Sequence, residues 1–143
     1  MKRSEKLRKL SEDHHHGLVV AMVLKGERKL PEALGWNGPL RTIRARLLSF
    51  WDTDLQKHFR QEEEEVFPAA DLISPAAHAL CESLRSEHQV IRQQIGNIRA
   101  ANEKDLAPLL AGLGNILEQH IRKEERELFE LIEAAGVEDM KDS

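Results

Sequence analysis

Residues 58–67 read His-Phe-Arg-Gln-Glu-Glu-Glu-Glu-Val-Phe, and residues 120–129 read His-Ile-Arg-Lys-Glu-Glu-Arg-Glu-Leu-Phe. The two segments share a histidine, an arginine, three glutamates and a closing phenylalanine at the same offsets. In each, a glutamate follows the histidine by four residues, so on an α-helix the two side chains lie one turn apart on the same face. Two such helices packed side by side would offer two imidazoles and two carboxylates, the arrangement with which helical bundles build di-iron sites.

The composition favours a helical protein. The chain has 143 residues, which suffices for one domain with a hydrophobic core. Charged residues make up 32% of it, aromatic residues only 4%, and tyrosine is absent, a pattern typical of helical folds. The formal net charge is -4 and no basic stripe follows a predicted helix, so we expect no nucleic-acid partner.

The sequence indicates a cytoplasmic protein that does not enter membranes. Residues 1–6 lack the apolar run of a secretory signal. No apolar stretch reaches the roughly 18 residues that a membrane-spanning helix needs. Cys81 is the single cysteine, so the chain can form no internal disulfide, and we expect a reducing compartment.

Hydrophobic periodicity and helix-breaking residues divide the chain into four helices. We predict them at about residues 4–25, 39–67, 74–101 and 105–136. Pro68 is expected to end the second helix, and Gly136 to terminate the fourth. Ser74 and Asp105 are expected to cap the third and fourth helices. Helices of this length with mostly short links predict an all-α fold, an up-down-up-down four-helix bundle.

We predict one domain, residues 1–136, followed by a C-terminal tail, residues 137–143. Residues 26–39 contain three glycines and two prolines, which indicates a loop with at most a short turn. Trp36 lies in this loop, and we expect its large apolar side chain to pack back onto the bundle.

Each predicted helix carries a histidine on its apolar stripe, where a leucine would be expected. His58 and Glu62 lie on the stripe of the second helix, and His120 and Glu124 lie on that of the fourth. An unpaired carboxylate in the core is costly, and a bound metal ion would remove that cost. Buried histidine–glutamate ion pairs, or helix ends more open to solvent than the stripes imply, would also explain the pattern.

The third helix offers an internal control. His78 and Glu82 have the same spacing as the two pairs above but point away from the apolar stripe, so we expect both to be solvated. His88 lies on the stripe. Alone it would be interpreted as a hydrogen-bonded core residue, but three other histidine-bearing helices favour it as a metal ligand. Arg92, one turn after His88, is not a ligand type.

In the first helix, His14, His15 and His16 cannot all face the core, because successive helical residues differ by about 100°. The residues before His14 resemble those before His88, with a leucine four positions earlier and an acidic residue immediately before, which favours His14. His15 has apolar neighbours at the same spacing as His88 and stays a candidate. His16 is expected to be exposed.

Five further glutamates belong to the repeated segments. Glu65 and Glu127 follow the paired glutamates by about one turn, so they either accept hydrogen bonds from ligand histidines or lie in solvent. Glu63, Glu64 and Glu125 are predicted to be surface charges.

These motifs resemble the hemerythrin-like family, in its HHE cation-binding branch. The resemblance spans about residues 7–131 and rests on four motifs that occur in bundle order. They are Leu10-x-x-Asp13-His14, His58-x-x-x-Glu62-Glu63 running to Phe67-Pro68, Ser86-Glu87-His88-x-x-Ile91 and His120-x-x-x-Glu124-Glu125. The resemblance implies a non-haem centre of two iron ions bridged by two carboxylates. It also implies dioxygen binding in some members and sensing of oxygen, iron or redox state in others.

Arg92 marks a departure from the oxygen-carrying members, which place a second histidine there. The candidate metal ligands are His14 or His15, His58, Glu62, His88, His120 and Glu124. Imidazole and carboxylate ligands suit iron, and zinc could take its place. Fewer histidines leave more open positions on the metal, which argues against stable oxygen carriage.

Three functions fit the sequence. The favoured one is a di-iron protein that binds or senses dioxygen or another small redox ligand. A di-iron enzyme acting on peroxide, nitric oxide or ferrous iron is less favoured, since no general acid or base stands out besides the ligands. A metal-free helical interaction module is disfavoured by the four stripe histidines. The sequence names no protein partner.

Overall fold

The computed structural model describes residues 5–136 of the chain, all of them in helices, turns and short links. The first long helix is α1 (Glu5–Leu24), and the third is α5 (Pro75–Ala100). The second is built from α2 (Leu40–Phe50), η2 (Trp51–Leu55), α3 (Gln56–Gln61), η3 (Glu62–Val66) and α4 (Phe67–Asp71). The fourth is built from α6 (Leu106–Lys123), η5 (Glu124–Leu128) and α7 (Phe129–Ala135). Two short 3₁₀ turns, η1 (Glu32–Leu34) and η4 (Glu103–Asp105), lie in the links.

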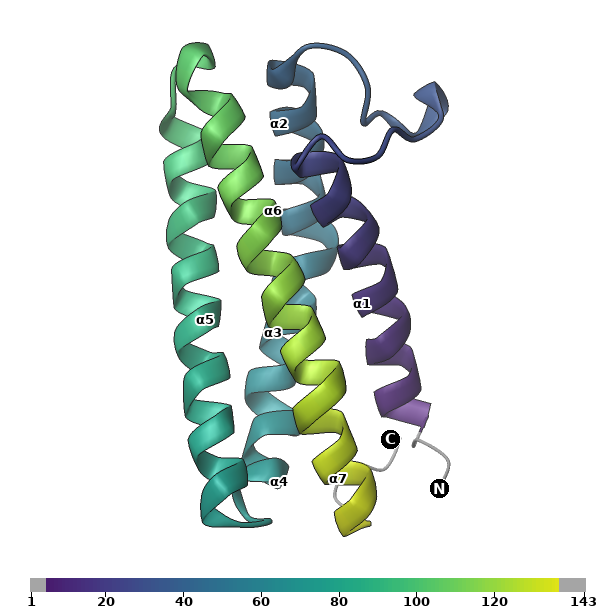
Figure 1. Ribbon diagram of the computed structural model, residues 1–143, viewed down its shortest axis with the longest axis vertical. Coiled ribbons are helices and arrows are strands. Elements are labelled where there is room, and N and C mark those ends of the chain that lie inside the picture. Colours follow the sequence, from purple (N-terminus) through teal and green to yellow (C-terminus); the bar gives the residue numbers. More distant parts are fainter. Residues whose placement is uncertain (1–4, 137–143) are drawn as a thin grey trace.

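Figure 1 shows the four long helices side by side, with successive helices running in opposite directions. The predicted all-α, up-down-up-down four-helix bundle is confirmed. No helix within residues 5–136 combines the length and the apolarity needed to cross a membrane. The predicted tail, residues 137–143, lies outside the described residues.

The helix ends follow the predicted signals with two differences. Ser74 caps α5 as predicted, since its hydroxyl accepts the backbone N–H of Ala77 at 3.0 Å. Gly136 follows α7 with a left-handed φ of 62°. Asp105 precedes α6, but its side chain makes no capping hydrogen bond because the 3₁₀ turn η4 leads into the helix instead.

Pro68 was wrongly predicted to end the second helix, which continues to Asp71. Pro68 occupies the first turn of α4, immediately after the π-helical turn η3. A proline costs least in the first turn of an α-helical segment, where its missing N–H is not needed. The wider turn before it therefore lets the helix pass through the proline.

The two repeated segments share this π turn. The backbone N–H of Phe67 donates to the carbonyl of Glu62, five residues earlier, and that of Phe129 donates to the carbonyl of Glu124. In both copies the π turn thus begins at the glutamate that follows the histidine by four residues, and it closes at the phenylalanine that ends the repeated segment. Turns of this type in α-helices are frequent at functional sites.

The core consists of two apolar clusters with a polar layer between them. One cluster, near the loop end of the bundle, includes Val20, Trp36 and Leu113. The other, near the opposite end, includes Leu10 and Phe129. The predicted packing of Trp36 onto the bundle is confirmed, since the residue is 3% exposed. A polar layer enclosed in this way is shielded from water along the bundle axis.

Gly114 sets the close approach of α6 to α1. A Cβ at this position would lie 2.7 Å from the carbonyl oxygen of Ala21, whereas one at Gly112 would meet no atom within 4 Å. We predict that Gly114→Ala lowers the free energy of unfolding by about 1–3 kcal/mol through overpacking. Gly112→Ala, the matched control, should raise it by about 0.5–1 kcal/mol. Urea unfolding of both variants checks this, and equal effects would contradict the close contact.

Candidate metal centre

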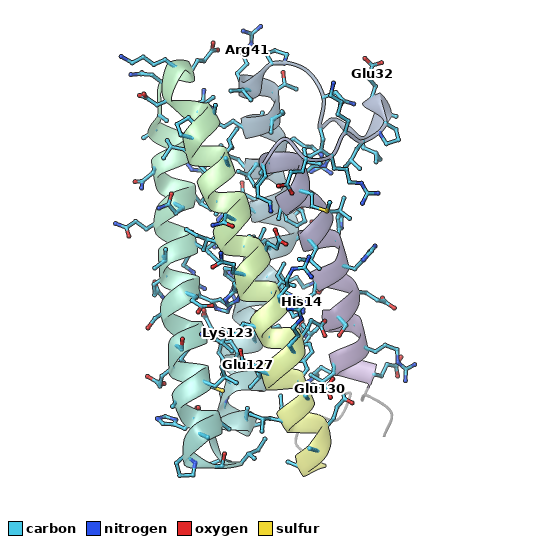
Figure 2. All side chains as sticks on the ribbon, in the orientation of Figure 1. His14, Glu32, Arg41, Lys123, Glu127 and Glu130 are labelled. Carbon is cyan, nitrogen blue, oxygen red and sulfur yellow. The ribbon has the colours of Figure 1, made fainter. Side chains whose placement is uncertain are left out.

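Six polar side chains lie buried together in the layer between the two apolar clusters. They are His14, His58, Glu62, His88, His120 and Glu124, and none is more than 5% exposed. All four long helices contribute, α1 and α5 with one histidine each and the other two with a histidine and a glutamate. Figure 2 shows His14 between the helices, well away from the loop end that carries Glu32 and Arg41.

The six side chains form two groups that share both glutamates. His14 and His58 lie with Glu62 and Glu124 in one group, and His88 and His120 lie with the same glutamates in the other. Within each group the potential ligand atoms all lie within 4.8 Å of one another. Two neighbouring metal ions could thus each have two imidazoles of their own while sharing two carboxylates.

The histidine Nε2 atoms face the glutamates. The Nε2 atom of His58 lies 3.3 Å from Glu62 Oε2, and that of His120 lies 2.6 Å from Glu124 Oε1. His14 Nε2 lies 3.5 Å from Glu62 Oε2 and 3.7 Å from Glu124 Oε1. His88 Nε2 lies 3.1 Å from Glu62 Oε1.

Most of these inward atoms lack hydrogen-bond geometry. Among the described residues, the buried atoms without a hydrogen-bond partner include Nε2 of His14, His58 and His120, Oε2 of Glu62 and both carboxylate oxygens of Glu124. Burying such groups without partners costs on the order of 1–3 kcal/mol each. Atoms that converge on a common centre rather than on each other are what metal ligands require, so the donor set fits a metal.

Each of the four histidines has an acidic residue within hydrogen-bond distance of its Nδ1 atom. We call these four residues, Asp13, Glu63, Glu87 and Glu125, the bracing acids. The Nδ1 atom of His14 lies 3.0 Å from Glu125, that of His58 3.1 Å from Asp13, that of His88 2.6 Å from Glu63 and that of His120 2.7 Å from Glu87. A carboxylate at Nδ1 favours the tautomer that carries the proton there and leaves Nε2 free to bind a metal.

These contacts form a closed ring around the bundle. On every long helix an acidic residue adjacent in sequence to a candidate ligand braces the histidine of a neighbouring helix. Asp13, next to His14, contacts His58 on the second helix. Glu63, next to Glu62, contacts His88 on α5. Glu87 on α5 contacts His120 on the fourth helix, and Glu125 on the fourth helix contacts His14 on α1, which closes the ring.

The bracing acids correct the sequence prediction. Glu63 and Glu125, predicted to be surface charges, accept hydrogen bonds from His88 and His14. Glu65 instead pairs with Lys6 at 3.2 Å, and the side chain of Glu127 is exposed. Each bracing acid adjoins a candidate ligand in the sequence, and that adjacency was the available signal.

The structure separates the histidines of α1. His14 is 3% exposed and lies in the cluster, whereas His15 and His16 are exposed. His15, kept as an alternative ligand in the sequence analysis, faces away because one residue along a helix turns the side chain by about 100°. His78 and Glu82 also lie outside the cluster.

Two cations support the bracing acids of His88 and His120. Arg92 pairs with both oxygens of Glu63, at 2.9 Å and 3.0 Å. Lys123 donates to Glu87 at 2.8 Å. Arg92 thus fixes the carboxylate that holds His88.

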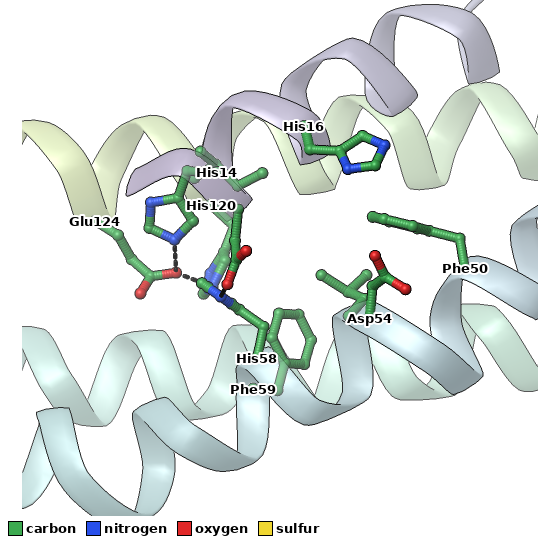
Figure 3. Close-up of a pocket in the computed structure, with 11 residues that line it drawn as sticks. His14, His16, Phe50, Asp54, His58, Phe59, His120 and Glu124 are labelled. Atoms are coloured by element: carbon green, nitrogen blue, oxygen red, sulfur yellow. Dashed lines mark hydrogen bonds and ion pairs between the residues drawn. The ribbon is translucent and has the colours of Figure 1, made fainter. Parts of the chain in front are cut away.

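A small cavity of about 20 Å³ opens beside the cluster, next to His14 and His58. Its walls are largely apolar and include Phe50, Leu55 and Ile121. The ring of Phe59, which also lines this cavity, stacks on His88 with centroids 3.8 Å apart and planes 9° from parallel. His120 and Glu124 line the cavity together with His14 and His58, so it reaches ligands of both groups (Figure 3).

The neighbouring carboxylates favour protonated histidines when no metal competes. Burial alone would lower the pKa of His58 and His120, but the charges of Glu62 and Glu124 and the bracing acids raise both to about 10. The same balance of burial against hydrogen bonds raises the pKa of His14 to about 9.

The pKa values of the two glutamates are shifted in opposite directions. Burial tends to raise the pKa of Glu62, but the positive charge of His58, followed by its close polar contacts with Glu124 and His14, holds this pKa well below its ordinary value. Burial and the negative charge of Glu62 raise the pKa of Glu124. Two carboxylates this close resist simultaneous ionisation because their negative charges repel each other.

These shifts predict that the chelator-treated protein loses stability as the pH rises. The folded-state pKa values of about 9 to 10 exceed the unfolded value near 6.5. The folded state therefore binds more protons in this window, and its extra stability, complete below pH 6.5, is lost towards pH 10. We expect a fall on the order of a few kcal/mol, measured by urea unfolding at several pH values. A flat profile would show that the folded apoprotein keeps these histidines neutral.

A family model described as Hemerythrin HHE cation binding domain matches residues 6–132. The match contains all six clustered side chains and all four bracing acids. No curated protein and no solved structure gives a significant match.

Proposed function

The chain belongs to the hemerythrin HHE cation-binding domain family, and from this premise we propose that its buried cluster binds two iron ions. The observation that carries the proposal is the sharing of Glu62 and Glu124 between two separate pairs of histidines. A single-ion site would need only one of these groups. Sharing two carboxylates places two cations next to each other, with the intervening negative charge reducing their repulsion.

In this proposal the residues have distinct roles. His14 and His58 would hold one ion, His88 and His120 would hold the other, and Glu62 and Glu124 would be shared by both. The bracing acids fix the imidazole rings and increase the basicity of Nε2. With two imidazoles and two shared carboxylates for each ion, the centre would leave room for a further ligand.

Iron is proposed over zinc because the centre combines open positions with a cavity. Nitrogen and oxygen ligands of this kind suit iron, zinc and manganese alike, so zinc could occupy the same side chains. When bound, iron would supply reversible one-electron chemistry, which zinc lacks. Apolar clusters enclose the layer at both ends of the bundle and limit the access of water along the bundle axis.

The ligand that we propose is dioxygen or another small redox-active molecule. A cavity of about 20 Å³ holds about one water-sized molecule. Phe50, Leu55 and Ile121 line it with apolar surface, which suits a small molecule of low polarity. Phe59 covers the ring of His88, so the small molecule would approach the centre beside His14, His58 and His120, which line the cavity.

Anaerobic loading with ferrous iron followed by exposure to air tests the function. Because Arg92 replaces a histidine, we expect the visible spectrum to change within the mixing experiment and not to revert under argon. Stopped-flow absorbance follows the change, and Arg92→His is the companion variant. A spectrum that reverts fully under argon would show reversible binding despite Arg92, and an unchanged spectrum would contradict the proposed redox ligand.

A further inference from the structure

The cavity beside the metal centre has two exposed, metal-binding types of side chain at its outer end. His16 comes from α1 and Asp54 from the π turn η2, and both line the cavity that reaches His14 and His58. Figure 3 shows His16, Phe50 and Asp54 at one end of this space and the clustered histidines with Glu124 at the other. The outer pair takes no part in the centre itself.

Local structure holds both outer side chains over the opening. The π turn Trp51–Leu55 brings Asp54 and Leu55 to the cavity wall, and the hydroxyl of Thr53 donates to the Asp54 carboxylate. The ring of His16 packs against Phe50, with centroids 5.3 Å apart. Two elements therefore place an imidazole and a carboxylate on either side of the same opening.

The inner end of the cavity presents buried nitrogen atoms of the type that binds metal cations. The Nε2 atoms of His14 and His58 are buried and lack hydrogen-bond partners, and both residues line the cavity. The lining also contains three carboxylates, those of Asp13, Asp54 and Glu124, and it contains no lysine or arginine. At the outer end, the Asp54 carboxylate has no lysine or arginine beside it in the lining, and a carboxylate in this position attracts cations.

A divalent cation entering an apolar passage must exchange its hydration water for protein ligands. First-row metals accept imidazole and carboxylate for this purpose. His16 and Asp54 at the opening, followed by His14 and His58 inside, offer such ligands in succession. Without the outer pair, the hydrated ion would have to lose water directly against Phe50 and Leu55.

We propose that His16 and Asp54 form a transient binding site for divalent transition-metal ions, through which these ions enter the buried centre. The inference rests on the proposed metal-binding function and adds the route of loading. In this proposal His16 and Asp54 increase the rate of metal uptake and leave the affinity of the buried centre for metal unchanged.

Stopped-flow uptake of Co²⁺ by chelator-treated protein tests this route, because Co²⁺ gains visible absorption bands in nitrogen and oxygen sites. The test variant is His16→Gln/Asp54→Asn, which keeps side-chain size. Its control is Asp52→Asn, which removes the same charge from the same π turn at a side chain that faces Arg99 at 3.9 Å. We expect uptake about tenfold slower in the double variant, with weaker dependence on ionic strength. The control should load at the wild-type rate.

Equilibrium dialysis on the same samples separates the two proposals. The final cobalt content and the circular dichroism spectrum of the double variant should equal those of the wild type. Wild-type uptake rates in the double variant would overturn the loading route and leave the metal centre intact. A slowdown of equal size in Asp52→Asn would also overturn it, since long-range charge alone would then explain the rate. A wild-type protein that takes up no cobalt would overturn the metal centre itself.

Discussion

Glu62→Ala and Glu124→Ala are each expected to reduce bound metal from about two ions per chain to a small fraction of one. Each glutamate contributes to both ligand groups, so removing either one weakens both metal positions at once. Removing His14 or His88 should affect mainly one position and leave a larger remainder. Metal analysis after iron loading and gel filtration measures the difference.

Glu82→Ala is the matched control for these variants. Glu82 also follows a histidine by four residues, but its side chain is 59% exposed and pairs with Arg85 at 2.6 Å. Its replacement should leave the metal content unchanged. Equal loss from Glu62→Ala, Glu124→Ala and Glu82→Ala would contradict the assignment, as would no loss from any of them.

Removal of the metal is expected to lower the melting temperature by about 10 °C. Without it, three histidines (His14, His58 and His120) and two glutamates stay buried with incomplete hydrogen bonding. A metal that binds only the folded state adds about 4 kcal/mol at a thousandfold excess over Kd. For a chain of this size, each kcal/mol shifts the melting temperature by a few degrees. Calorimetry with a chelator, and then with added ferrous iron, measures the loss and its recovery.

The His58→Leu/Glu62→Leu double variant separates metal binding from ordinary core packing. It should lose the response to chelator and to iron, because two ligands are replaced by apolar side chains. Its melting temperature should equal or exceed that of the chelator-treated wild type, since apolar groups replace incompletely satisfied polar ones. A wild-type melting curve that ignores the chelator would show that the buried histidines are core residues without a metal.

Local geometry explains which parts of the centre could be predicted from the sequence. His58 with Glu62, and His120 with Glu124, lie one turn apart on a helix whatever the helix packs against. The choice between His14 and His15 depended on the rotation of α1, and their apolar neighbours gave conflicting indications. Packing of α1 against α6, with the close contact at Gly114, settles that rotation in the structure.

The contacts of the bracing acids could not be predicted from one helix at a time, because each acid contacts a histidine on a neighbouring helix. Glu63 and Glu125 look solvated when their own helices are considered alone, yet each reaches a histidine of the adjacent helix. The π turns were missed for a related reason, since a pattern of 3.6 residues per turn contains no place for an extra residue. That turn also explains why the helix continues through Pro68.

We propose that six buried side chains hold two metal ions, with Glu62 and Glu124 shared between them. Anomalous diffraction at the iron edge, from crystals loaded anaerobically with ferrous iron, tests it most directly. We predict two peaks, one beside His14 and His58 and one beside His88 and His120, both next to the shared glutamates. A single peak, no peak in the cluster, or iron only at the exposed group of Asp71, His78 and Glu82 would contradict the account.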